Sequence, residues 1–143
     1  MRTQRSTQVA YRSGTTAVEF TMIAPLLFTF VFACIEVGHA MMVIQTLEEA
    51  ARRGCREAIL DDAAEADVKS TVVDFLATGG IPVSTSKVNI NPSSLDTSCL
   101  WDPITVDVSV LFSNVSWIPV PQFLGSVALS GSSTLPREGN PCE

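Results

Sequence analysis

Residues 14–36, GTTAVEFTMIAPLLFTFVFACIE, decide the fold of this chain. Residues 20–35 carry no charge, and an acidic residue stands on each side of them, Glu19 before and Glu36 after. The length of this run is close to the lower limit of the roughly 17 to 25 residues that a membrane-spanning helix needs. We therefore predict a transmembrane helix at residues 15–44, in which one of the two carboxylates lies at an interface or finds a partner.

Charge is distributed unevenly around this helix. The chain has 143 residues and a net charge of −6, yet residues 1–14 contain three arginines and no acid. Because positive residues flank the cytoplasmic side of membrane helices, we expect this basic leader in the cytoplasm and residues 45–143 on the opposite side. The acidic balance also argues against nucleic acid as a partner, since such binding needs clustered Lys and Arg.

The helix is expected to continue beyond the membrane to about residue 60. No proline occurs from residue 39 to residue 60, and apolar residues recur there at spacings of three or four. A second amphipathic helix is expected after Asp61 and Asp62, which have N-cap character, and should end at Gly79 and Gly80. The apolar stripe of the first helix comprises Ala40, Ile44, Leu47, Ala51, Cys55 and Ile59.

Beyond Pro82 the apolar residues alternate with polar ones, which is typical of strands. One short alternation contains Val88 and Ile90, a longer one runs from residue 104 to 112, and a third lies at residues 127–135. We therefore predict an α+β fold. It consists of a long N-terminal helix with a transmembrane and an amphipathic half, a second short helix, and a small antiparallel sheet of about three strands.

Two common export signals fit the N-terminus poorly. A Sec signal peptide needs a cleavage site of small residues after the apolar run, where Glu36 and His39 stand instead. A lipoprotein signal would use Cys34, but the bulky Phe32 fits badly in the sequence that precedes this cysteine.

A third signal fits better. The string GTTAVEF, residues 14–20, resembles the type IV prepilin signal, in which a Glu becomes the fifth mature residue and an aromatic residue, here Phe20, follows it. The resemblance implies a cut after Gly14. Such a cut would create an α-amino group on Thr15, four residues before Glu19, and so supply the costly membrane-edge carboxylate with a cation.

Most of the chain, and residues 14–56 above all, resembles the TadE-like pseudopilins of tight-adherence (Flp) pili. The segments that carry the resemblance are AVEF at 17–20, PLL at 25–27, IEVG at 35–38 and AARRGCR at 50–56, with a weaker one, LPRE, at 135–138. Members of this family often carry an arginine where His39 stands here.

The resemblance implies a non-enzymatic minor pilin-like subunit of the bacterial inner membrane. It would be trimmed by a prepilin peptidase and would act with other pilus subunits and the inner-membrane assembly platform in pilus biogenesis and adhesion. Incorporation into the surface pilus itself is compatible with this role. Glu19, Phe20 and Glu36 are the residues that the resemblance assigns to assembly.

Residues 114–124, NVSWIPVPQFL, form a loop punctuated by prolines. If this loop is exposed, Trp117, Ile118 and Phe123 would make a contact patch, and if it folds down they would cap a small core. The alternative to a pilus subunit is a lipoprotein or signal-anchored envelope protein that binds a partner through this loop.

The four cysteines divide by location. Cys34 lies in the predicted membrane helix, whereas the other three face an oxidising exterior. We expect a disulfide between Cys99 and Cys142, with Cys55 bonded to either of them as the alternative. The lone histidine cannot supply a Ser-His-Asp triad or a multi-His metal site, so we expect no enzymatic activity, no metal and no cofactor.

Overall fold

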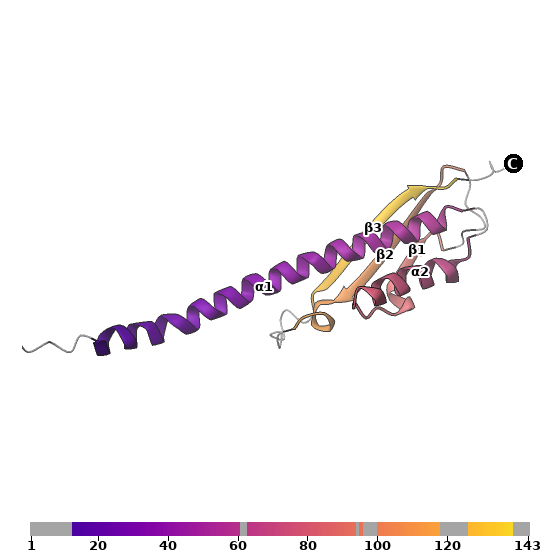
Figure 1. The fold of residues 1–143 in the computed structure, drawn as a ribbon. Coiled ribbons are helices and arrows are strands. Elements are labelled where there is room, and N and C mark those ends of the chain that lie inside the picture. Colours follow the sequence, from indigo (N-terminus) through magenta and orange to yellow (C-terminus); the bar gives the residue numbers. More distant parts are fainter. Residues whose placement is uncertain (1–12, 61–62, 94, 96–99, 118–125, 139–143) are drawn as a thin grey trace, which may run out of the picture. The chain divides into compact units, whose positions relative to one another are not determined.

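The computed structural model describes residues 13–60, 63–93, 95, 100–117 and 126–138, and its elements confirm the predicted α+β fold (Figure 1). The chain divides into two units, residues 1–35 and residues 36–143. In chain order the elements are α1 (Ser13–Ala58), α2 (Glu65–Thr78), the 3-10 turn η1 (Thr85–Lys87), β1 (Val88–Asn91), β2 (Pro103–Leu111), the 3-10 turn η3 (Phe112–Asn114) and β3 (Ala128–Pro136).

The first unit contains the N-terminal part of α1, whose large apolar side chains are exposed. Phe20 is 69% exposed and Met22 is 78% exposed, and the residues from Ile23 to Ile35 follow the same pattern. A helix that is apolar on all sides needs an apolar environment. Helix α1 is long and apolar enough to cross a membrane.

Two threonine hydroxyl groups in this part of α1 form hydrogen bonds within the helix. The hydroxyl groups of Thr21 and Thr29 donate hydrogen bonds of 2.8 Å to the carbonyl oxygens of Ala17 and Pro25. Pro25 lies inside α1, and the helix continues through it. The threonines therefore present no unpaired hydroxyl to an apolar environment.

In the second unit, α1 provides one wall of the core. Leu47, Ala51 and Cys55 of the predicted apolar stripe are fully buried, and the other members of the stripe are partly buried. Val43 falls within the range 15–44 that we assigned to the membrane, yet it is only 3% exposed and packs in this core. Packing of α1 on the domain thus begins before residue 45.

The sheet has the strand order β1-β2-β3, with both neighbouring pairs antiparallel. Alternate residues of β2 are buried, so one face of the sheet packs in the core with α1 and α2, while Thr105 and Thr134 share a 2.8 Å hydrogen bond on the other face. Phe112, which we had placed in the strand, begins η3 instead. The chain turns there because the backbone N–H groups of Val115 and Ser116 both donate to the Phe112 carbonyl.

The second helix ends at Gly79 and Gly80 as predicted, but it starts later than predicted. Its N-cap is Ala64, which makes no side-chain capping hydrogen bond, and Asp61 and Asp62 lie outside the described residues. The acidic residues in the first turn of α2 stabilise the helix, because they lie near the positive end of its dipole. Gly80 has a φ of 74°, which suits glycine at a helix end.

Two glycines allow the core elements to approach closely. A Cβ atom built on Gly54 of α1 would lie 2.6 Å from Cγ2 of Val72 in α2. A Cβ atom built on Gly131 of β3 would lie 2.4 Å from the backbone nitrogen of Glu48 and 2.4 Å from the carbonyl carbon of Leu47. The backbone of β3 therefore packs directly on the backbone of α1.

Candidate functional site

The residues of the predicted processing site lie at the start of α1. Gly14 and Glu19 are exposed, as is Phe20, while Thr15 is helical. Gly14 lies in the first turn, where helices fray and where the poor helix propensity of glycine eases local unwinding. Among the described residues Glu19 forms no ion pair, so its carboxylate is available to the cation that the predicted cut would create at Thr15.

Four residues of the second unit meet near the end of the apolar run, and we call them the junction cluster: Glu36, His39, Ser116 and Trp117. The Ser116 hydroxyl donates a hydrogen bond to Oε1 of Glu36, across 80 residues of sequence. The rings of His39 and Trp117 lie with their centroids 5.0 Å apart and their planes inclined by 40°. The structure thus gives Glu36 the partner that a carboxylate beside an apolar helix needs.

Within the junction cluster, the two aromatic rings differ in exposure. Nδ1 of His39 is buried and has no hydrogen-bond partner among the described residues. Trp117, in contrast, is 79% exposed although one side of its ring system contacts His39. The other two residues of the predicted contact patch, Ile118 and Phe123, lie outside the described residues.

The family-like segment 50–56 contains two arginines with structural contacts. Arg52 and Arg53 lie 3.3 and 3.4 Å from the carboxylates of Glu48 and Glu49, one helical turn earlier. The guanidinium carbon of Arg53 also lies 4.0 Å from the ring centroid of Phe75 in α2. These side chains are about half exposed, so each ion pair contributes little. The contact of Arg53 with Phe75 additionally joins α1 to α2.

Cys34 and Cys55 are both free thiols in the structure. Cys34 is exposed on the apolar part of α1, whereas Cys55 is buried. Its single S–H donor lies near two carbonyl oxygens, that of Ser133 at 3.0 Å and that of Ile104 at 3.7 Å. Burial raises the pKa of the Cys55 thiol above its ordinary value. Cys99 and Cys142 lie outside the described residues, so their disulfide stays a prediction.

The raised pKa predicts that the free energy of unfolding decreases in alkaline solution. Above about pH 8.5 the unfolded chain loses the thiol proton while the folded chain keeps it, so the unfolded state gains stability relative to the folded state. Urea unfolding of the full chain in detergent, at pH values on either side of this point, measures the effect. Cys55→Ala should reduce the alkaline loss of stability. An equal loss in both proteins would contradict the assignment to Cys55.

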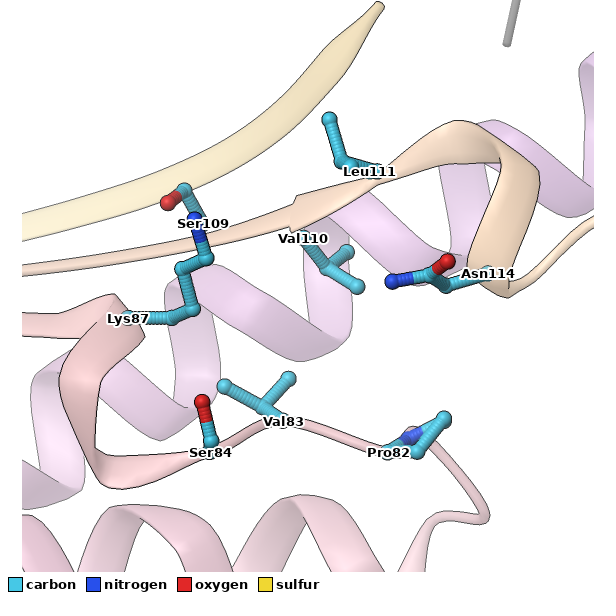
Figure 2. A pocket seen from close by; sticks show the side chains of 8 residues that line it. All are labelled: Pro82, Val83, Ser84, Lys87, Ser109, Val110, Leu111 and Asn114. Carbon is cyan, nitrogen blue, oxygen red and sulfur yellow. The ribbon is translucent and has the colours of Figure 1, made fainter. Parts of the chain in front are cut away.

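A pocket of about 390 Å³ lies between the segment that follows α2 and the end of β2 (Figure 2). Figure 2 shows Val83 and Val110 facing each other, with the Lys87 side chain extending toward Ser109. The lining contains one cation and no carboxylate, histidine or cysteine, so it holds no acid-base pair. The lining residues are Pro82, Val83, Ser84, Lys87, Ser109, Val110, Leu111 and Asn114.

Arg137 has a structural role that the sequence pattern did not reveal beyond its place in the weakly resembling segment 135–138. Its side chain is buried and donates to the carbonyl oxygen of Leu95. Its backbone N–H donates to the Asp102 carbonyl at 2.9 Å, and its own carbonyl accepts from Trp101 at 3.1 Å. Arg137 thus ties the end of β3 to the segments that precede β2.

Comparison with known proteins confirms the resemblance found in the sequence. Residues 14–56 match the family model described as TadE-like protein. The match lies wholly within α1, contains Gly14, Glu19, Glu36 and His39, and does not extend into α2 or the sheet. Neither a curated protein nor a solved structure matches the chain.

Proposed function

We propose that this chain is a TadE-like, non-enzymatic, pilin-like subunit that acts in the assembly of a tight-adherence pilus and in adhesion. It spans the bacterial inner membrane once, with its basic leader in the cytoplasm and its α+β domain on the other side. Its partners are membrane lipid, a prepilin peptidase, other pilus subunits and the assembly platform in the membrane.

The observation that carries this proposal is the coincidence of the family match with α1. The matched residues 14–56 fall in one helix, whose first part exposes apolar side chains and whose second part forms the core of the folded domain. One helix thus supplies both an apolar surface for lipid or neighbouring helices and the spine of the domain, as a membrane-anchored subunit requires.

The test of this proposal is the mature N-terminus. The intact mass of the protein extracted from membranes should correspond to a chain that begins at Thr15, with or without an N-methyl group. Gly14→Leu should retain the leader, because a peptidase working at the bilayer edge needs an accessible backbone at the cut. A Cβ atom built on Gly14 meets no atom within 4 Å, so this substitution does not disturb the packing of the described residues.

Gly38→Leu is the matched control, since Gly38 also lies in α1 and its built Cβ atom likewise meets nothing within 4 Å. This variant should be trimmed like the natural protein. A mature chain that starts with a lipidated Cys34 would instead support the alternative, an envelope lipoprotein. A full-length chain with its leader intact would contradict trimming after Gly14 and would support the other form of the alternative, a signal-anchored envelope protein.

A further inference from the structure

We infer that Trp117 inserts into the interfacial layer of the membrane and holds the folded domain against the bilayer surface. This inference rests on the proposed membrane span. It assigns lipid, in the region between headgroups and acyl chains, as the partner of an exposed tryptophan on the domain.

Trp117 lies level with Glu36 and His39 along α1. The uncharged run of α1 ends at Ile35, and Glu36 and His39 are the next polar residues. Trp117 contacts His39, and its neighbour Ser116 is hydrogen-bonded to Glu36. If the apolar run occupies the hydrocarbon, these contacts place the indole where hydrocarbon gives way to headgroups.

The side chain of Trp117 has the chemistry of a residue that lies at a membrane surface. Trp117 is 79% exposed, so most of its large apolar surface has no cover from the described part of the chain. An indole ring combines an apolar body with one N–H donor, and tryptophan is enriched at membrane-water interfaces for this reason. Lipid would remove this apolar surface from water without leaving the N–H unpaired.

Strand β2 runs along the part of α1 that lies in the domain, with its two ends at different levels of the helix. Cys55 contacts the carbonyl oxygen of Ile104, near the start of β2, whereas His39 contacts Trp117, beyond the end of β2. Sixteen residues of helix separate these contacts, or about 24 Å. Trp101, which precedes β2 and is 74% exposed, therefore lies at the end of the domain opposite to Trp117.

The two tryptophans of this chain provide a matched test. Trp101→Phe leaves Trp117 as the single fluorophore, and Trp117→Phe leaves Trp101. Each full-length variant is reconstituted into phosphatidylcholine vesicles with bromine atoms on the acyl chains close to the headgroup. We expect the brominated lipid to remove most of the Trp117 emission and little of the Trp101 emission. Acrylamide, a quencher dissolved in water, should give the opposite order.

Flotation of the vesicles tests the membrane span separately from the insertion of Trp117. A protein that does not float with lipid would overturn the membrane span and this inference with it. A protein that floats, but whose Trp117 and Trp101 are quenched equally by brominated lipid, would overturn the inference alone. Trp117 emission shielded from both acrylamide and brominated lipid would also overturn it, and would indicate that a second protein subunit covers the tryptophan.

Discussion

Gly131→Ala is expected to lower the free energy of unfolding by about 3 kcal/mol, the upper end of the usual cost of overpacking a core. The added Cβ atom would lie 2.4 Å from backbone atoms of both Leu47 and Glu48. Backbone atoms inside a helix cannot rotate away as a side-chain methyl group can, so β3 and α1 must separate. Thermal unfolding of the full chain in detergent, followed by circular dichroism, measures the loss as a lower Tm.

Two substitutions provide controls for this prediction. Ser132→Ala changes an exposed neighbour in β3 and should alter stability by no more than about 0.5 kcal/mol. Gly54→Ala should cost less than Gly131→Ala, because its nearest neighbour is a methyl group of Val72 rather than backbone. A Tm of Gly131→Ala equal to that of the natural protein would show that β3 does not pack on α1 as described.

Glu19→Gln is expected to reduce copurification with other pilus components by about tenfold, the effect of 1.4 kcal/mol on one association equilibrium. Trimming after Gly14 would place an α-ammonium group four residues before Glu19. Side chains and groups four residues apart on a helix lie on the same face, so this cation can reach the Glu19 carboxylate. The pair can form within one subunit or between neighbours, and glutamine removes its negative member.

Glu36→Gln is the matched comparison for this experiment, because Glu36 flanks the same apolar run. Glu36 already accepts a hydrogen bond from Ser116, and glutamine keeps a carbonyl oxygen that can accept it. Glu36→Gln should therefore weaken assembly less than Glu19→Gln. Both variants should be trimmed normally. If Glu19→Gln copurified at the natural yield, the carboxylate would be dispensable and the apolar helix alone would account for assembly.

The helices and strands in which apolar residues recur at regular spacing were predictable from the sequence. The apolar stripe through Leu47, Ala51 and Cys55 is buried as expected, and the alternation along β2 gives the inward face of the sheet. These predictions succeed because a helix or strand with one buried side has apolar residues at regular intervals along the sequence. The predicted end of β2 was wrong, because the apolar spacing includes Phe112. This residue is buried, but it belongs to η3 and not to the strand.

Contacts between distant segments could not be predicted in this way. The bond from Ser116 to Glu36 joins residues 80 positions apart, and nothing in either neighbourhood encodes it. The requirement for glycine at position 131 arises from the α1 backbone, which a β3 sequence pattern cannot reveal. The predicted processing residues Gly14 and Glu19 were found through the family resemblance, since their role depends on a cut that local structure does not show.

The packing of β3 on α1 also has a consequence for biosynthesis. Helix α1 is the first described element to leave the ribosome and β3 is the last, yet Gly131 must rest on Leu47 and Glu48 before the core closes. At about 5 to 20 residues per second, the roughly 80 residues between them take on the order of 4 to 16 s to synthesise. If the domain crosses the membrane as proposed, the segments that emerge first should be sensitive to envelope proteases, and the domain should acquire resistance to them only after its last strand has crossed.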